Sequence, residues 1–309
     1  MEKSTYQKNA DKVSAKREMF DAGETKSRIG PKLKKSSFLD SLEEVEDFFI
    51  VESMKRGYDN AYDVVASENP CFKTLSYTEY GGNFMVMPLN NDLKRDMIMD
   101  SLLSPEASFS WDKYYSEVVA NKAANKYNDR NTLSKVARKS LIVPVGTNKF
   151  IEILDIDKIA DVCKREPTYV KPHPITTHEY IGLLMDKCGE DSVLKRDDDL
   201  YALMVNCDKV YTTHYSESML YAAMLGKDID VVDRLGRHFQ AGFWHFNSFI
   251  LRTPKEARIP QINKVFSSHH SGIFNPRVEN NWRDKMVLFL DYMDERRKHF
   301  EGIFITQRQ

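Results

Sequence analysis

The 309-residue sequence lacks the features that mark membrane-spanning and secreted proteins. It has no run of about 18 apolar residues, the length that a transmembrane helix requires. Residues Met1–Ala10 contain no apolar core of the kind found in signal peptides. The four cysteines are widely scattered without a CxxC pair, which is typical of proteins in a reducing compartment. These absences predict a cytoplasmic protein that does not insert into a membrane.

The chain as a whole also has no large excess of positive or negative charge, because 45 Lys and Arg residues are balanced by 46 Asp and Glu residues. The balance excludes a uniformly basic surface, so a nucleic-acid site has to be sought locally. Residues 1–36 are the exception, with ten basic and five acidic residues. We expect a flexible basic arm in which Lys32, Lys34 and Lys35 contact a phosphate backbone; the alternative is a solvated tail.

Strands and helices alternate regularly from residue 140 onward. The expected strands are Ser140–Val145, Thr168–Val170, Ser192–Leu194, Lys209–Thr212 and Ile229–Val232, and the expected helices are Asp157–Lys164, His178–Cys188, Leu200–Asn206 and Ser216–Leu225. Strands that alternate with helices of about ten residues imply right-handed βαβ crossovers. The fold class is therefore predicted to be α/β, with a doubly wound parallel sheet.

The sequence before residue 140 predicts a smaller α/β lobe. Asp47–Val51 and Phe84–Leu89 have the apolar character of short buried strands, and Trp111–Ala137 has helical spacing. At the other end of the chain, Val278–Phe300 reads as a long helix. We thus expect a basic arm at 1–36, an acceptor-side lobe at 37–139, a Rossmann-like domain at 140–277 and a C-terminal helix at 278–309.

Polar residues gather where the expected strands of the parallel sheet end. Ligands bind in the crevice at the carboxyl edge of such a sheet, and a helix that begins there offers unpaired N–H groups to phosphate. The candidate ligand-binding residues at these ends are Gly146, Thr147, Lys171, His173, Thr213, His214, Ser216, Glu217 and Ser218. A structural role for His173 is about equally expected, and His214 could simply cap its turn.

The order of these motifs resembles the C-terminal donor-binding domain of GT-B glycosyltransferases, notably the capsule-polysaccharide and Kdo-transferase type. The resemblance covers Ser140–Asp233 and includes the KPHP turn and the helix that ends in Leu-Gly-Lys. It implies that Lys171, His173 and Ser216 contact the phosphates of a nucleotide-sugar. Tyr221 occupies the position of the family's ribose-binding Glu. Glu217 could make the contact with the ribose instead.

This resemblance implies an inverting glycosyl transfer that needs neither a metal nor a cofactor other than the nucleotide-sugar substrate. Cationic groups and helix N–H groups would stabilise the leaving diphosphate. The His269–His270 pair has no spacing diagnostic of zinc, and no metal site is expected. The catalytic base is expected in the N-terminal lobe, with Glu52 and Glu79 as candidates, although either could be a surface carboxylate.

The acceptor is predicted to be a hydroxymethylated pyrimidine in double-stranded bacteriophage DNA, onto which a hexosyl or arabinosyl group is transferred. The basic arm would hold the DNA, and Arg237 and Trp244 could stack on a sugar or a base, or else plug the space between lobes. Three alternatives stay open. They are a capsule or surface polysaccharide glycosyltransferase, a sugar-nucleotide epimerase or hydrolase, and a non-catalytic nucleic-acid-binding module.

Overall fold

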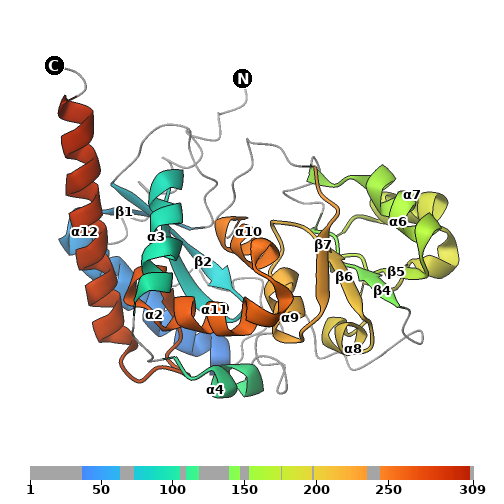
Figure 1. Cartoon of the computed structure of the whole chain (residues 1–309), viewed down its shortest axis with the longest axis horizontal. Coiled ribbons are helices and arrows are strands. Elements are labelled where there is room, and N and C mark those ends of the chain that lie inside the picture. The colour runs from blue at the N-terminus through green and yellow to red at the C-terminus, as the bar shows by residue number, and fades with distance from the viewer. Residues whose placement is uncertain are drawn as a thin grey trace. The chain divides into compact units, whose positions relative to one another are not determined.

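A computed structural model describes residues 37–62, 73–104, 109–117, 139–146, 153–174, 176–196, 198–234 and 244–306 (Figure 1). The chain divides into two compact units. The first comprises Met1–Ala124, Phe239–His245 and Pro260–Gln309, and the second comprises Asn125–His238 and Phe246–Ile259. The first unit thus takes in the C-terminal helix, which the linear division of the sequence had set apart.

The first unit contains a mixed sheet. Its strands run in the order β1 (Asp59–Tyr62), β2 (Thr74–Tyr80), β3 (Asn83–Pro88) and β8 (Ile273–Phe274). The β1 and β2 strands are parallel, whereas β2 pairs with β3, and β3 with β8, in antiparallel orientation. The β3 strand confirms the prediction for Phe84–Leu89, with an early start because Gly81 and Gly82, both at positive φ, form the preceding turn.

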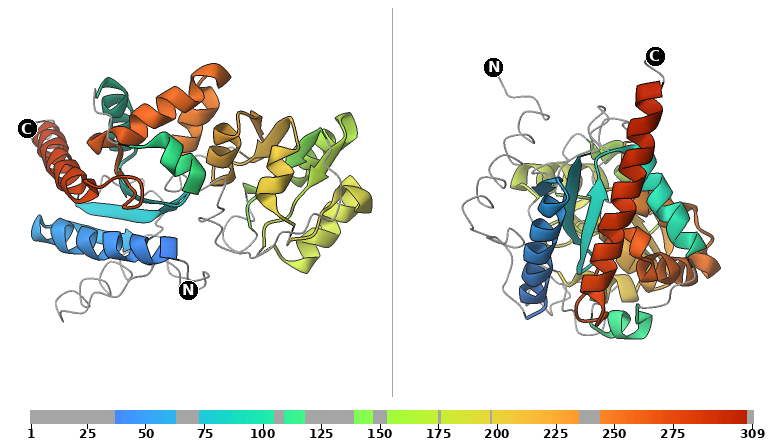
Figure 2. Two further views of the ribbon diagram at one scale, coloured as in Figure 1. Left: turned by 90° about the horizontal axis from the view of Figure 1, so that it is seen from below. Right: turned by 90° about the vertical axis from the view of Figure 1, so that its left-hand side faces the viewer.

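Helices cover both faces of this mixed sheet (Figure 2). The α2 helix (Ser37–Lys55) lies against one face, and α3 (Asn91–Leu103) lies on the other, while α12 (Trp282–Thr306) runs beside β8. Two shorter elements also belong to this unit, namely α4 (Trp111–Tyr115) and the 3-10 helix η4 (His269–Ser271). The expected helix Trp111–Ala137 is described only as far as residue 117.

The prediction of a strand at Asp47–Val51 is wrong, because these residues lie inside α2. Leu42, Val45 and Phe49 are fully buried and recur at helical spacing, so the apolar run is one stripe of an amphipathic helix. The Phe49 ring packs 5.5 Å from that of Tyr77 on β2. A short apolar run does not by itself distinguish a buried strand from a buried helix face.

The second unit contains the predicted parallel sheet. Its strands run in the order β5 (Thr168–Val170), β4 (Ser140–Ile142), β6 (Lys209–Thr212) and β7 (Asp228–Val231), and every neighbouring pair is parallel. Val193 adds an isolated parallel bridge to Val170 at the outer side of β5, in place of the expected strand Ser192–Leu194. Counted along the chain, the spatial order is 3-2-1-4-5, which is that of Rossmann-like sheets.

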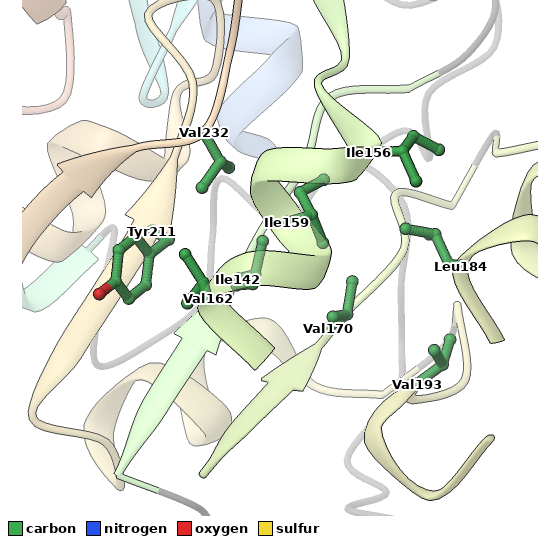
Figure 3. Packing of buried hydrophobic residues seen from close by; sticks show 9 residues of the cluster. All are labelled: Ile142, Ile156, Ile159, Val162, Val170, Leu184, Val193, Tyr211 and Val232. Atoms are coloured by element: carbon green, nitrogen blue, oxygen red, sulfur yellow. The ribbon is translucent and has the colours of Figure 1, made fainter. Parts of the chain in front are cut away.

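Helices lie on both faces of the parallel sheet. The α6 (Ile156–Arg165) and α7 (His178–Cys188) helices pack together over one face, where their apolar side chains join Ile142, Val170 and Tyr211 in a buried cluster (Figure 3). Thr212, the neighbour of Tyr211, points to the opposite face and bonds to Ser218 of α9 (Ser218–Met224). The α8 helix (Leu200–Val205) packs on α9 through the rings of Tyr201 and Tyr221.

Side-chain caps set the starts of three of these helices. Asp155 caps α6 by accepting from the Lys158 N–H, Thr177 caps α7, and Asp199 caps α8 by accepting from the Ala202 N–H. These bonds satisfy backbone donors that have no partner within the helix. Such local signals explain why the predicted starts at 157, 178 and 200 agree with the structure to within one residue.

Two helices contribute residues to both units. They are α10 (Trp244–Arg252) and α11 (Lys255–Ser267), which contains Pro260. The first 3-10 turn after α7, η3 (Glu190–Ser192), belongs to the second unit alone. None of the helices in the described ranges is both long and apolar enough to cross a membrane.

Candidate functional site

The candidate site is the carboxyl edge of the β5-β4-β6-β7 sheet, where β4 and β6 lie side by side. The chain leaves β4 toward Val193 by way of β5, and it leaves β6 in the opposite direction toward β7, so the strand order reverses between β4 and β6. In open α/β sheets a ligand binds at this reversal. Residues 143–146 after β4 are buried, including Gly146, while Thr147 lies outside the described residues.

The loop after β6 carries a buried histidine and carboxylate pair. The His214 Nδ1 atom lies 3.0 Å from Asp233 Oδ2, and the His214 backbone N–H donates to the same oxygen at 2.7 Å. The side chain of Asp233 is 0% exposed and that of His214 is 7% exposed. Because a carboxylate can only accept, it keeps a proton on Nδ1 and sets both the tautomer and the orientation of the ring.

Asn247 of α10 also holds this loop. Its side-chain amide donates to the backbone oxygens of His214 at 2.9 Å and of Ser216 at 3.0 Å. Asn247 is fully buried, so these bonds are shielded from water. Together with Asp233, it fixes the path of residues 214–216 independently of any ligand.

The same segment of the chain also carries several hydroxyl groups. Ser218 Oγ is hydrogen-bonded to both Thr212 Oγ1 and Ser216 Oγ. The Thr213 hydroxyl is completely buried and has no hydrogen-bond partner among the described residues. Leaving a buried hydroxyl without a hydrogen-bond partner costs about 1–3 kcal/mol. A ligand that hydrogen-bonded to the Thr213 hydroxyl would recover this free energy.

Tyr215 adds a neutral group to this loop. Burial raises the pKa of its phenol, and the negative charge of Asp233 raises it further. The Tyr215 hydroxyl therefore stays protonated beside the carboxylate across the physiological pH range.

The helix after this loop begins later than expected. It starts at Ser218 with Glu217 as its N-cap residue, and the Glu217 side chain makes no capping bond. Ser216 therefore lies in the loop, where its hydroxyl accepts from the Ser218 N–H at 3.2 Å. Gly226, at positive φ, terminates the helix as predicted.

Lys171 and His173 follow β5, as predicted, but the lysine is already engaged within the protein. Its ammonium group donates to the backbone oxygens of Arg196 at 3.0 Å and of Pro172 at 3.3 Å, and the side chain is buried. His173 is half-buried, and its carbonyl accepts from the Thr176 N–H at 2.9 Å, which closes the turn. Lys171 thus ties two strand-end segments together, and its contact with a phosphate stays a prediction.

The two candidate bases occupy different environments in the first unit. Glu52 lies in α2 rather than after a strand, and it forms ion pairs with Lys55 at 2.7 Å and Arg56 at 3.0 Å. The bond from Lys55 lowers the pKa of Glu52 against the opposing effect of burial, and Arg56 lowers it further, which makes Glu52 a weaker base. Glu79 lies in β2 and is only 2% exposed.

Most of the candidate acceptor-binding residues lie outside the described part of the chain. This is true of Lys32, Lys34, Lys35 and Arg237. Trp244 begins α10 in the first unit, half-buried, with its ring 4.9 Å from that of His245. The acceptor-side predictions are thus tested only by experiment.

Asp233 and Asn247 are the site residues that sequence reasoning missed. Asp233 comes two residues after the end of β7, so the rule that polar residues at strand ends form the site applied to it equally well. Asn247 carries no such signal, because it lies on a helix far along the chain from the loop that it holds.

The described residues contain no cluster of three or more His, Cys, Asp or Glu side chains arranged to hold a metal ion. Of the three consecutive acidic residues 197–199, Asp199 caps α8 and Asp198 accepts from the Lys195 N–H at 3.1 Å. A scan against models of known protein families and a search among curated proteins both found no match.

Proposed function

We propose that the chain is a GT-B-type glycosyltransferase that binds the nucleotide of a nucleotide-sugar at the carboxyl edge of the parallel sheet. The observation that carries the proposal is the buried His214–Asp233 pair at the end of β6, next to the point where the strand order reverses. Loops at this reversal suit a nucleoside diphosphate, and the resemblance of Ser140–Asp233 to donor-binding domains supports the same ligand.

In this proposal His214 faces the negative charge that develops on the leaving diphosphate. Asp233 holds Nδ1, so Nε2 is the ring nitrogen that would contact the ligand in this proposal. A hydrogen-bond donor that is already oriented before the reaction stabilises the transition state without a free-energy cost of reorientation. The Thr213 hydroxyl and the KPHP turn would supply the remaining polar contacts.

The transfer itself joins an acceptor oxygen to the anomeric carbon and breaks the bond from that carbon to the diphosphate. The acceptor hydroxyl loses its proton to a base, for which Glu79 remains the better of the two candidates, because Glu52 is neutralised by two cations. We propose a hydroxymethylated pyrimidine in double-stranded DNA as the acceptor. The basic composition of residues 1–36 supports a polyanionic partner.

Mass spectrometry tests the proposal. The full-length protein is incubated with a panel of sugar nucleotides together with hydroxymethylated duplex DNA or an oligosaccharide, and the nucleosides and glycans are then analysed. A glycosylated hydroxymethylpyrimidine supports the full proposal, and a glycosylated oligosaccharide supports transfer to a polysaccharide instead. Consumption of donor without an acceptor product identifies an epimerase or hydrolase. DNA binding without any turnover identifies a non-catalytic module.

Two histidine substitutions, one in the candidate site and one outside it, test whether the activity depends on the site. His214→Ala should reduce turnover and the affinity for a nucleoside diphosphate, while His299→Ala, on the exposed side of α12, should change neither. Equal behaviour of the two variants would place the nucleotide elsewhere.

A further inference from the structure

Two cysteines meet where α6 packs against α7. Cys163 lies near the end of α6, and Cys188 is the last residue of α7. Both are partly exposed and pack against the rim of the apolar cluster shown in Figure 3. Small molecules in solution can therefore reach the pair. The two helices that carry it, α6 and α7, pack together through the buried cluster.

The two thiols interact directly. The Cys163 thiol hydrogen-bonds to the sulfur of Cys188, which lowers the pKa of Cys188; burial opposes this effect and the charge of Lys164 adds to it. A thiolate, rather than a thiol, attacks a disulfide, so the lowered pKa of Cys188 favours attack by this sulfur. The third described cysteine differs, because Cys207 is buried and burial raises its pKa to about 11.

We propose that Cys163 and Cys188 are a thiol–disulfide exchange site, at which a small-molecule disulfide such as oxidised glutathione converts the pair into an intramolecular disulfide. The Cys188 thiolate first attacks one sulfur of the small molecule, forms a mixed disulfide and releases one small thiol. The Cys163 sulfur then attacks Cys188, forms the protein disulfide and releases the second small thiol. The two released thiols carry away the two protons and two electrons.

The bond would enclose residues 164–187, which include β5 and the turn with Lys171 and His173. It would join the helix before this strand to the helix after it. Such a crosslink restricts the unfolded chain and limits the movement of the turn relative to α6 and α7. In a reducing compartment a disulfide of this kind is transient, which suits a response to oxidants rather than a permanent staple.

Peptide mapping after oxidation tests the exchange site. The full-length protein with C71S, which removes the one cysteine outside the described residues, is incubated with oxidised glutathione, alkylated and digested. We expect a disulfide between the peptides that contain Cys163 and Cys188, with Cys207 recovered in alkylated form. In the C163S variant, glutathione should remain on Cys188, which should react at least about tenfold faster than Cys207.

The C207S variant is the matched control and should form the same crosslink as its parent. Lasting glutathione adducts on Cys188 in the parent protein, at the level seen in C163S, would overturn the proposal. A crosslink that joins Cys207 to either partner would overturn it as well. None of these outcomes depends on glycosyl transfer.

Discussion

Asp233 Oδ2 accepts two hydrogen bonds from one residue, the backbone N–H of His214 at 2.7 Å and its Nδ1 at 3.0 Å. The loop after β6 is thereby joined to the end of β7 by a buried carboxylate. The pair both holds the loop in place and orients an imidazole ring, so removing the carboxylate should affect stability and ligand binding together.

Replacing Asp233 by Ala should lower the free energy of unfolding by about 1.5–3 kcal/mol, because two bonds to a buried charged group are lost. Asp233→Asn should keep more of this stability but reduce turnover, because its carbonyl oxygen can still accept a hydrogen bond while its NH₂ group replaces the other acceptor oxygen that faces Nδ1. Denaturant titration and steady-state kinetics measure the two effects. Asp230→Ala is the control, because its ion pair with Lys209 is exposed and a change below about 1 kcal/mol is expected.

Lys171→Ala and His173→Ala should each reduce turnover about tenfold or more if the two side chains bind the diphosphate. Lys171→Ala should also destabilise the second unit, because the backbone oxygen of Arg196 loses its buried donor. Kinetics at a temperature where both variants remain folded separate binding from stability, and unchanged kinetics in both would refute the assignment.

Deleting residues 1–36 should weaken binding to duplex DNA and flatten its dependence on salt, because each lost phosphate contact removes one released counterion. Affinity for the nucleotide-sugar should stay nearly constant. Fluorescence anisotropy at several salt concentrations gives the slope. If the shortened protein binds DNA as the full chain does, the segment does not contribute to the interface.

Lys94 should make stability depend on pH. It is 3% exposed, its Nζ has no hydrogen-bond partner among the described residues, and burial lowers its pKa from 10.5 to about 7. Between these two values the unfolded chain binds the proton that the folded chain has released, so the unfolding free energy should rise with pH by roughly 1 kcal/mol per unit.

The Lys94→Met variant should remove that slope and be more stable than the parent protein at pH 7. Arg95→Met, at the exposed neighbouring position, is the control and should keep the slope. Denaturant titrations from pH 7 to pH 10 measure the difference. A slope that persists in Lys94→Met would show that another group causes it.

The buried ion pair of Lys285 and Glu279 should be costly to break from one side. The two groups are 2.6 Å apart and 3% and 0% exposed, and Lys285 also donates to the Phe266 carbonyl. Lys285→Met should destabilise the first unit by about 3–5 kcal/mol, because the buried carboxylate of Glu279 loses the lysine that is 2.6 Å away. The double variant Lys285→Met with Glu279→Leu should recover much of this loss in thermal unfolding. Equal stability of the single and double variants would contradict the pairing.

The sequence alone predicted much of the parallel half of the fold. The bounds of Thr168–Val170, His178–Cys188 and Lys209–Thr212 agree with the structure residue by residue. Short runs of strand-forming residues and side-chain caps are local signals. They favour a strand or the start of a helix without depending on residues far away in the sequence. The rule that ligands bind at strand ends placed His214 in the candidate site by the same kind of reasoning.

The tertiary structure decided what depends on partners far apart in the chain. Asp47–Val51 became helical because Phe49 belongs to a stripe that packs on Tyr77, and Lys171 turned toward the Arg196 carbonyl instead of solvent. Asn247 reached the loop of His214 from a helix that no local pattern connects with it. The local sequence largely determines which helices and strands form. Burial and hydrogen bonding between distant segments determine which side chains contact each other, and these contacts form only when the helices and strands pack together.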